Sequence, residues 1–440
     1  KDLNLNKESD LSYDRLAIAT GAYPLQALEN RRGLDNQYTV TKPYEVEDLK
    51  GKLDDVEDIV VIGGGFIGLE MVENLVKRGL NVTLVEKAPQ ILTPLDEEMA
   101  IFVENELLKN NVKIIKGESA VEFQNAGKKV ILENGEVLTS DLTVLSIGVK
   151  PATEIVGEAG IELGIRGGIL VDERYETNIE DIYAVGDAIL VKQQITGEDA
   201  LISLASPANR QGRQVADIIA GYDRLNRGSI GTSIVRVFDI SAASTGLNER
   251  QVKAAGFDYA VTHTSAKHHA GYYPGAKMIE LKVIFDAKTG ELYGAQAVGE
   301  KGIDKRIDII ATAIKGNLTV YDLPELEFTY APPFGSAKDP VNMAGYQGIN
   351  LLEGFTDTIQ WYELEDKMAQ GWKLLDVRSE AEVKSGGYIE GSIIIPLNDL
   401  RDRLDEIDPA EKYIVSCHSG QRSYIAERIL KQNEYKAKNL

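Results

Sequence analysis

Cys417 is the one cysteine of the 440-residue chain, and its surroundings favour thiolate chemistry. An apolar run ends at Val415, and Cys417 then opens a polar loop that leads directly into a helical pattern over residues 423–431. Backbone N–H groups of such a loop and the amino end of a helix lower the pKa of a thiol below its free value of about 8.5. Arg422 closes the loop, and we expect it to pair with anionic sulfur or with the sulfur donor. The alternative, a buried inert cysteine, fits a polar loop poorly.

A second group of residues forms a glycine-rich turn between an apolar strand and a helix. Gly63, Gly65 and Gly68 have the spacing GxGxxG. In this pattern the first glycine permits a tight turn, the second lets a pyrophosphate approach the backbone, and the third lets the helix pack closely. Phe66 and Ile67 open the predicted helix, where free N–H groups favour an anion. The turn therefore predicts dinucleotide binding, and the alternative is a purely structural glycine turn.

An acidic residue follows this turn where a nucleotide ribose is expected. Glu86 ends the next apolar run and is placed to hydrogen-bond the adenosine ribose hydroxyls. Its charge would repel a 2′-phosphate, which favours NADH over NADPH, although Lys87 beside it leaves NADPH possible. Gly148 belongs to a run at 144–151 that closely repeats the strand ending before Gly21. We expect both runs to end nucleotide-binding units in the same way, with a glycine and a crossover.

Two further segments place polar groups at the ends of predicted elements. A short strand ends in Gly186 and Asp187, at the carboxyl edge where open α/β sheets bind ligands. Pro207 suits the first turn of the helix that follows, and Ala208 comes next. The amino end of that helix favours a group that becomes negative, such as a reduced flavin pyrimidine. The alternatives are an ordinary turn and a surface helix capped by proline.

The elements that must position these residues follow an α/β pattern. Helices are expected at 66–78, 96–110 and 305–315, and an alternating strand at 279–285 followed by a hairpin partner at 292–298. The first runs, 2–5 and 13–20, predict a hairpin. Residues 345–354, which contain three glycines, form the predicted linker, and a fresh α/β pattern begins near Trp361.

In their order and spacing, four segments resemble the flavoprotein disulfide reductases that have two dinucleotide-binding domains. They are ATG at 19–21, GGGFIGLE at 63–70, YAVGDA at 183–188 and LASPANRQGR at 204–213. Segments 302–308 and 330–343 narrow the resemblance to the branch of coenzyme A-disulfide reductases and NADH-dependent persulfide (polysulfide) reductases. The strands at 374–378 and 391–397 and the Cys417 loop are similar to a rhodanese domain, although Tyr388 departs from its usual histidine.

The resemblance implies an α/β fold with an FAD domain interrupted by an NAD domain, an α+β dimerisation domain and a C-terminal rhodanese domain. The expected division is a remnant of the FAD-binding domain at 1–50, an NAD(P)H-binding domain at 51–150, the second FAD part at 151–230, a dimerisation domain at 231–345, a linker at 346–360 and a rhodanese domain at 361–440. The FAD contacts it implies are Thr20, Gly21, Gly186, Asp187, Pro207 and Ala208. The family's N-terminal GxGxxG and redox cysteine have no counterpart here, so we expect about a hundred residues to precede Lys1 and a short segment to follow Leu440.

The activity that the resemblance implies is FAD- and NADH-dependent reduction of coenzyme A disulfide, coenzyme A persulfide or polysulfide. Cys417 would carry sulfane sulfur from a donor as a persulfide. Tyr330, together with Tyr272 or Tyr273, matches tyrosines that face the redox cysteine of a partner subunit, which implies a homodimer; the alternative is interface packing. Two other hypotheses stay open, an NADH oxidase or peroxidase and a sulfurtransferase on a non-catalytic flavoprotein scaffold, and a third is a binding module without chemistry.

Composition limits the remaining choices. The formal net charge of −21 opposes binding to a phosphate backbone, so nucleic acid is not an expected partner. No run of 18 apolar residues occurs, which predicts no membrane span. A single cysteine fits a reducing cytoplasm. The four histidines have no metal-ligand spacing, so no metal is expected, and the pair His268 and His269 is interpreted as a solvated loop.

Overall fold

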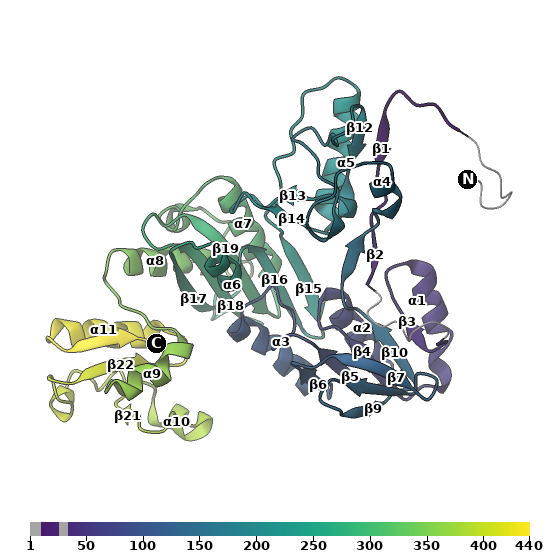
Figure 1. Ribbon diagram of the computed structural model, residues 1–440. Coiled ribbons are helices and arrows are strands. Elements are labelled where there is room, and N and C mark those ends of the chain that lie inside the picture. Colours follow the sequence, from purple (N-terminus) through teal and green to yellow (C-terminus); the bar gives the residue numbers. More distant parts are fainter. Residues whose placement is uncertain (1–9, 26–33) are drawn as a thin grey trace. The chain divides into compact units, whose positions relative to one another are not determined.

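The computed structural model describes residues 10–25 and 34–440 and divides the chain into two compact units, Lys1–Asp239 and Ile240–Leu440 (Figure 1). The strands of the first unit are β1 (Leu16–Ile18), β2 (Ala22–Pro24), β3 (Gln37–Tyr38), β4 (Asp58–Ile62), β5 (Asn81–Glu86), β6 (Lys113–Lys116), β7 (Ala120–Gln124), β8 (Lys129–Leu132), β9 (Val137–Thr139), β10 (Leu142–Leu145), β11 (Val149–Pro151), β12 (Ile182–Ala184), β13 (Val191–Lys192), β14 (Asp199–Ala200) and β15 (Ser233–Val237). Its helices are α1 (Pro43–Lys50), α2 (Phe66–Val76), α3 (Glu97–Lys109), α4 (Glu154–Glu158) and α5 (Ala205–Ile219).

The first unit contains a five-stranded parallel sheet in the order β3-β10-β4-β5-β6. Strands β4 and β10 consist almost entirely of buried residues, as expected for parallel strands that are covered on both faces. Helix α2 packs on β4, β5 and β10, and the antiparallel strands β7, β8 and β9 form a separate three-stranded sheet. The glycine-rich turn therefore lies at the carboxyl edge of a doubly covered sheet.

The two similar runs that end before Gly21 and after Gly148 meet in the structure. Strand β2 pairs antiparallel with β11, with Ala22 opposite Pro151. Strand β1 pairs parallel with β12, so the chain segments that follow both strands leave from the same edge. The predicted hairpin at 2–5 and 13–20 falls partly outside the described residues, and its described part instead contributes the short parallel strand β1.

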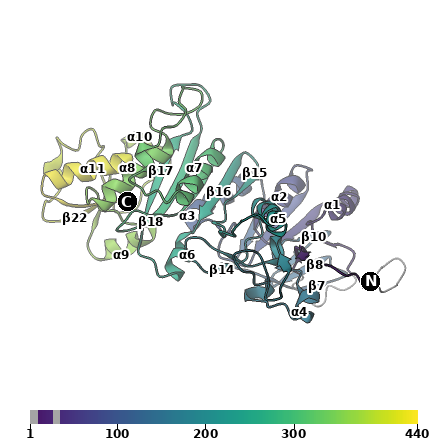
Figure 2. The same ribbon diagram turned by 90° about the horizontal axis from the view of Figure 1, so that it is seen from above.

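The second unit contains an antiparallel sheet and a smaller parallel sheet. Its strands are β16 (Ile240–Gly246), β17 (Tyr259–Lys267), β18 (Met278–Asp286), β19 (Leu292–Gly299), β20 (Lys373–Asp376), β21 (Ile393–Ile394), β22 (Lys412–Ser416) and β23 (Lys436–Asn439). Its helices are α6 (Glu249–Ala254), α7 (Ile303–Lys315), α8 (Pro340–Leu352), α9 (Leu364–Ala369), α10 (Glu380–Gly386) and α11 (Gln421–Gln432). Within the second unit the antiparallel order is β16-β19-β18-β17, and α7 packs on β16 and β19. Figure 2 shows α7 beside β16. The parallel order is β21-β20-β22-β23.

The predicted helices and the predicted hairpin of 279–285 with 292–298 are confirmed, but the burial of residues along β18 differs from the expected alternation. In β18, Lys282 alternates in sequence with apolar residues, yet its side chain is fully buried. Its ammonium group lies 2.5 Å from the buried carboxylate of Glu249, which begins α6. The carboxylate of Glu249 thus compensates the charge of Lys282, which is removed from water.

The predicted linker at 345–354 was wrong for most of its length, because α8 continues to Leu352. Gly345 and Gly348 are sites of close packing: a Cβ on Gly345 would lie 2.5 Å from Pro324 Cδ, and one on Gly348 would lie 3.1 Å from Val320. The glycines therefore bring α8 against its neighbours, and the irregular connection is confined to residues 353–360.

Candidate functional site

The glycine-rich turn connects β4 to α2 and has the shape that a dinucleotide requires. Gly63 has φ +105°, and a Cβ there would lie 2.2 Å from the carbonyl oxygen of Ser146. A Cβ on Gly68 would lie 1.9 Å from the carbonyl oxygen of Gly63. By contrast, a Cβ on Gly65 would meet no atom within 4 Å. Gly63 and Gly68 are therefore required by the fold, whereas the space beside Gly65 is free for a ligand.

The first turn of α2 leaves its N–H groups available. Gly65 is the N-cap residue, and no side chain caps the helix. Phe66 and Ile67 follow at the first helical positions, where unpaired N–H groups bind a phosphate. These features fit a pyrophosphate at this helix end.

Glu86 lies at the end of β5, beside this turn. Its Oε2 accepts the N–H of Gly64 at 2.6 Å, and its Oε1 accepts the N–H of Ala88 at 2.8 Å. These bonds fix the carboxylate, and a carboxylate oxygen retains a second lone pair for a ribose hydroxyl. Gly148 follows β10 at the same edge of the sheet. The structure thus brings together the residues predicted for NAD.

A second edge gathers the residues predicted for FAD. Because β1 runs parallel to β12, Thr20 and Gly21 leave the sheet at the same edge as Gly186 and Asp187. A Cβ on Gly186 would lie 3.9 Å from the Cβ of Ala208, in the first turns of α5.

The electrostatics of this second edge also fit a cofactor. Burial raises the pKa of Asp187, and no hydrogen bond or ion pair of its carboxylate is found among residues 10–25 and 34–440. Helix α5 begins at Ala205 without a side-chain cap, and Pro207 is buried in its first turn. A half-buried carboxylate and an open helix terminus match the hydroxyl groups and the electron-accepting ring of a flavin.

Cys417 directly follows β22, and α11 begins four residues later. Gly420, the N-cap of α11, has φ +83° and donates its N–H to Cys417 Sγ at 3.1 Å. The hydroxyl of Ser423 lies 3.4 Å from the same sulfur. Burial raises the pKa of the Cys417 thiol, but hydrogen bonds from Ser423, Ser419 and Gly420 outweigh it, and the pKa lies below its usual value. These contacts favour the thiolate form of Cys417.

Arg422 is placed differently from the expectation. Its guanidinium donates to both oxygens of Glu382, at 2.8 and 2.7 Å, and no hydrogen bond joins it to Cys417 among the described residues. The carboxylate of Glu382 matches the planar fork of the arginine, which a single sulfur atom does not. The hydrogen bonds that Arg422 donates to Glu382 raise the pKa of Arg422, and the charges of Glu382 and Cys417 raise it further. The guanidinium, five positions after Cys417 in the chain, is therefore engaged by a carboxylate.

The three predicted tyrosines, Tyr272, Tyr273 and Tyr330, lie on two loops of the second unit. The hydroxyls of Tyr272 and Tyr330 are 3.5 Å apart, and the hydrogen bond between them raises the pKa of Tyr272. Tyr273 packs edge-on against His269. All three side chains are exposed, with Tyr272 at 77%. The structure thus joins Tyr272 to Tyr330 within one chain.

The interpretation of His268 and His269 as a solvated loop was wrong. His269 is 5% exposed. His268 Nδ1 accepts the N–H of Lys277 at 3.0 Å, and burial lowers the pKa of His268. Both rings pack where β17 ends.

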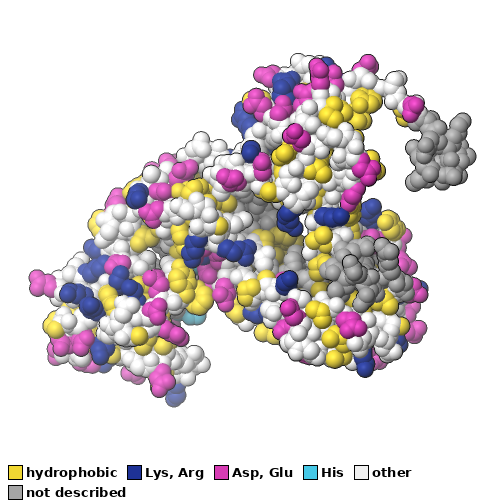
Figure 3. All heavy atoms as spheres, viewed as in Figure 1, with side chains coloured by type: hydrophobic (Ala, Val, Ile, Leu, Met, Phe, Trp, Pro, Cys, Tyr) yellow, Lys and Arg dark blue, Asp and Glu magenta, His cyan; other side chains and the backbone are white. Residues whose placement is uncertain are grey.

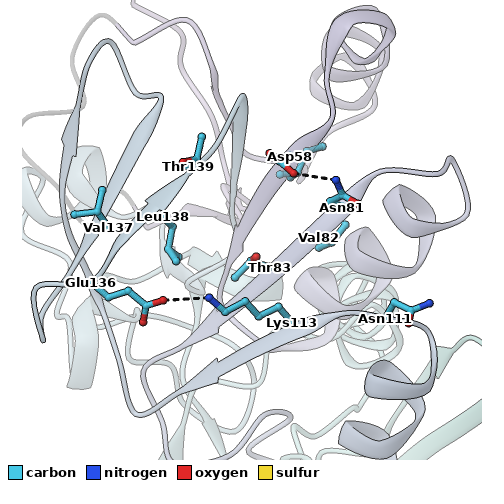
Figure 4. A pocket seen from close by; sticks show the side chains of 11 residues that line it. Asp58, Asn81, Val82, Thr83, Asn111, Lys113, Glu136, Val137, Leu138 and Thr139 are labelled. Carbon is cyan, nitrogen blue, oxygen red and sulfur yellow. Dashed lines mark hydrogen bonds and ion pairs between the residues drawn. The ribbon is translucent and has the colours of Figure 1, made fainter.

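One cavity of about 360 Å³ lies away from these residues, at the amino ends of β4, β5 and β6 (Figure 4). An Asp58–Asn81 hydrogen bond of 3.0 Å and a Lys113–Glu136 ion pair of 3.1 Å lie along its wall. Because β4 and β5 carry the nucleotide residues at their carboxyl ends, this cavity is at the opposite edge of the sheet.

Sequence reasoning missed Glu382, Ser423 and Gln211. Gln211 accepts the N–H of Gly186 at 2.7 Å. The residues 379–382 have the S-x-x-E pattern of a capping box, and this signal could have located Glu382 at the start of a helix. No local pattern indicates that Glu382 meets Arg422, forty positions later.

Family models match the chain in three parts. The pyridine nucleotide-disulphide oxidoreductase model matches residues 1–212, the dimerisation domain of that family matches 232–340, and the rhodanese-like domain matches 360–440. Coenzyme A disulfide reductase of Staphylococcus aureus (strain bovine RF122 / ET3-1) is 33% identical over 348 residues, which are 78% of this chain and 77% of the relative. The chain belongs to the pyridine nucleotide-disulphide oxidoreductase family. The mixed α/β fold of this oxidoreductase includes the dimerisation domain and a C-terminal rhodanese domain.

Solved structures agree with this assignment. The oxidoreductase matches reduced Bacillus anthracis CoADR-RHD with a TM-score of 0.97 and 44% identity, over 100% of this chain and 80% of that one. It matches a NAD-dependent persulfide reductase from A. fulgidus with a TM-score of 0.91 and 37% identity, over 98% and 79%. A water-forming NADH oxidase from Lactobacillus brevis, at 21% identity and a TM-score of 0.77 over 81% and 79%, shares the fold alone.

Proposed function

We propose that this oxidoreductase is an NADH-dependent flavoenzyme that reduces coenzyme A disulfide, coenzyme A persulfide or polysulfide, and that Cys417 carries sulfane sulfur. Relatives named coenzyme A disulfide reductase and persulfide reductase support the reduction. The observation that carries the proposal is that one chain contains both a nucleotide turn with free space at Gly65 and a loop that stabilises a thiolate at Cys417.

The nicotinamide dinucleotide would be held by the β4–α2 turn. The N–H groups of Phe66 and Ile67 would bind its pyrophosphate beside Gly65, between the structural glycines Gly63 and Gly68. Glu86 would accept ribose hydroxyls, and its charge favours NADH because a 2′-phosphate would be repelled. Gly148 would border the same nucleotide.

FAD would be held at the second edge, where Asp187 would accept hydrogen bonds from its hydroxyl groups. Thr20, Gly21 and Gly186 would line the same edge, and Pro207 and Ala208 would bring the open end of α5 to the ring. Electron transfer between NADH and a sulfur substrate is the chemistry that bound FAD supplies.

Cys417 would accept sulfur by nucleophilic displacement at a persulfide. Its thiolate attacks the outer sulfur of a persulfide RS–SH, a new S–S bond forms, the RS–SH bond breaks, and RS⁻ leaves with the electron pair. The product is a Cys417 persulfide, and the N–H of Gly420 stabilises the attacking thiolate. Coenzyme A is a thiol of the required class.

Tyr272 and Tyr330 would donate hydrogen bonds at the reductase site of a partner subunit, with Tyr273 packed beside them, in a homodimer. Their exposure and mutual hydrogen bond support this role. Replacing Tyr272 by Phe is expected to lower kcat for coenzyme A disulfide and to leave sulfur transfer by Cys417 unchanged. Tyr321→Phe, at another exposed tyrosine, is the control. Equal kcat values in the two variants would exclude the role.

The domain division also remains a proposal, with the linker moved to residues 353–360 and the boundary of the dimerisation domain moved to match. Among the described residues, no helix has the length and apolar character needed to cross a membrane. The single cysteine supports a reducing compartment, and we place the enzyme in the cytoplasm.

The flavin content of the purified holoenzyme tests the proposed function. We expect a yellow protein whose visible absorbance falls when NADH is added in the absence of oxygen. A colourless protein that still transfers sulfur would instead support a sulfurtransferase on a non-catalytic scaffold. If the flavin absorbance recovers when oxygen is added but does not recover when coenzyme A disulfide is added, the result would support an NADH oxidase.

A further inference from the structure

The ion pair between Glu382 and Arg422 stands beside the sulfur-carrying loop. Its two hydrogen bonds are bidentate, at 2.8 and 2.7 Å, so the carboxylate occupies the fork of the guanidinium. Bidentate forks are the groups that recognise oxyanions such as carboxylate, phosphate or sulfonate. The guanidinium of Arg422, which could bind an oxyanion near Cys417, is therefore already occupied by a carboxylate of the protein.

Glu382 is also fixed from its own helix. It is the third residue of α10, and its Oε2 accepts the N–H of Ser379 at 3.0 Å and the hydroxyl of Ser379 at 2.7 Å. This capping box holds the carboxylate in place independently of Arg422. An incoming anion would have to displace a carboxylate that does not swing away freely.

A second arginine, Arg378, is also occupied by a carboxylate of the protein. Arg378 donates from Nε and Nη2 to Asp376, with its shortest contact at 2.6 Å, and from Nη2 to the carbonyl of Gly387 at 2.8 Å. Asp376 is buried at the end of β20. Both guanidinium groups thus have internal carboxylate partners.

We propose that Glu382 determines the class of sulfur donor by occupying Arg422, so that Cys417 accepts sulfur from thiol persulfides and discriminates against thiosulfate. This inference rests on the proposed sulfur transfer. With thiosulfate, Cys417 thiolate would attack the sulfane sulfur, and sulfite would leave with the electron pair of the broken S–S bond. The departing sulfite carries negative charge on its oxygens, and an unoccupied guanidinium of Arg422 would stabilise that charge. A departing thiolate RS⁻ carries its charge on one sulfur and does not.

Glu382→Gln tests the proposal, because glutamine preserves the capping box but removes the competing charge. The matched control is Glu406→Gln, which breaks the bidentate pair of Glu406 with Arg403 in the same domain. Both pairs are partly exposed and contribute little to stability, so both variants are expected to fold.

The holoenzyme and each variant are assayed for transfer of sulfur to cyanide, which attacks the Cys417 persulfide and releases thiocyanate and the thiolate. With thiosulfate as donor, Glu382→Gln is expected to raise kcat/KM by about tenfold, the worth of one charge-assisted hydrogen bond. With glutathione persulfide as donor, kcat/KM is expected to stay within about twofold. The gain should vanish in Glu382→Gln/Arg422→Lys, because lysine has no fork.

A second measurement does not depend on turnover. Cys417 is alkylated with anionic iodoacetate and with neutral iodoacetamide, and the ratio of the two rates is compared. Glu382→Gln should raise this ratio relative to Glu406→Gln and wild type. An unchanged ratio together with an unchanged thiosulfate kcat/KM overturns the role of Glu382. Failure of wild type to transfer sulfur from any donor overturns the proposed sulfur transfer and, with it, the selection of donors by Glu382. A raised alkylation ratio in the variant would then show only that Glu382 keeps anions away from Arg422.

Discussion

At the scale of single residues, the reactivity of Cys417 depends on a small set of donors. Burial of the thiol opposes ionisation, and hydrogen bonds from Ser423, Ser419 and Gly420 favour it more strongly. Three of these donors are the backbone N–H groups of Ser419, Gly420 and Ser423, and Ser423 also contributes its hydroxyl, which is fully buried 3.4 Å from the sulfur. That hydroxyl is the one donor in the set that a substitution can remove without altering the backbone.

Ser423→Ala is therefore expected to raise the pKa of Cys417. Because the thiolate is the nucleophile, the rate of alkylation by iodoacetamide rises with pH as the thiol ionises, and the variant's profile should lie at higher pH than that of wild type. At neutral pH its rate should fall several-fold. Ser419→Ala retains its backbone N–H and serves as the control, with a profile like that of wild type. Coincident profiles for all three proteins would mean that the Ser423 hydroxyl does not stabilise the thiolate.

At the scale of elements, the β4–α2 turn separates ligand binding from folding. A Cβ on Gly65 meets no protein atom within 4 Å, and its φ of −82° suits alanine. Gly65→Ala should thus leave the Tm unchanged while its methyl group occupies the space for a pyrophosphate. We expect the Kd for NADH to rise about tenfold or more, measured by calorimetric titration.

Gly68→Ala is the contrasting variant of the same turn. Its Cβ would lie 1.9 Å from the carbonyl oxygen of Gly63, so strand and helix must separate. Overpacking of this kind costs about 2 kcal/mol, and the Tm should fall. If Gly65→Ala lowered the Tm as much as Gly68→Ala and left the Kd unchanged, the ligand would lie elsewhere.

The elements also show what sequence patterns can and cannot predict. The helices at 66–78, 96–110 and 305–315 were predictable because each combines a hydrophobic period with local start and stop signals. The linker was not, because glycines that permit close packing, such as Gly345, look the same in sequence as glycines that permit flexibility. Burial of Lys282 depends on Glu249, which comes from another element.

In the candidate site, too, the local geometry could be predicted from the sequence and the tertiary contacts could not. The residues of the nucleotide turn and the Cys417 loop are contiguous, so their local geometry follows from spacing alone. The partner of Arg422 could not be predicted, because Glu382 approaches it from a helix distant in sequence, and tertiary contacts of this kind have no local signal.

At the scale of the whole molecule, the distribution of surface charge and the oligomeric state can be considered. Acidic and basic side chains are interspersed over the face in Figure 3, and the acidic ones do not gather in one patch there. The dimerisation-domain match at 232–340 supports a homodimer. Light scattering on the eluting holoenzyme should give twice the mass of its single chain. A single peak at the mass of one chain, at concentrations where the holoenzyme is active, would contradict the dimer and the role of Tyr272 and Tyr330 across it.

The most direct test of the central claim is to measure NADH consumption by the holoenzyme in the absence of oxygen, before and after coenzyme A disulfide or coenzyme A persulfide is added. We predict that NADH is consumed only after the addition. One NADH and one proton should yield two coenzyme A thiols from the disulfide, or one coenzyme A thiol and one hydrogen sulfide from the persulfide. Gly65→Ala should slow this reaction at low NADH. If neither substrate starts NADH consumption while oxygen does, the enzyme is not a reductase of coenzyme A-linked sulfur.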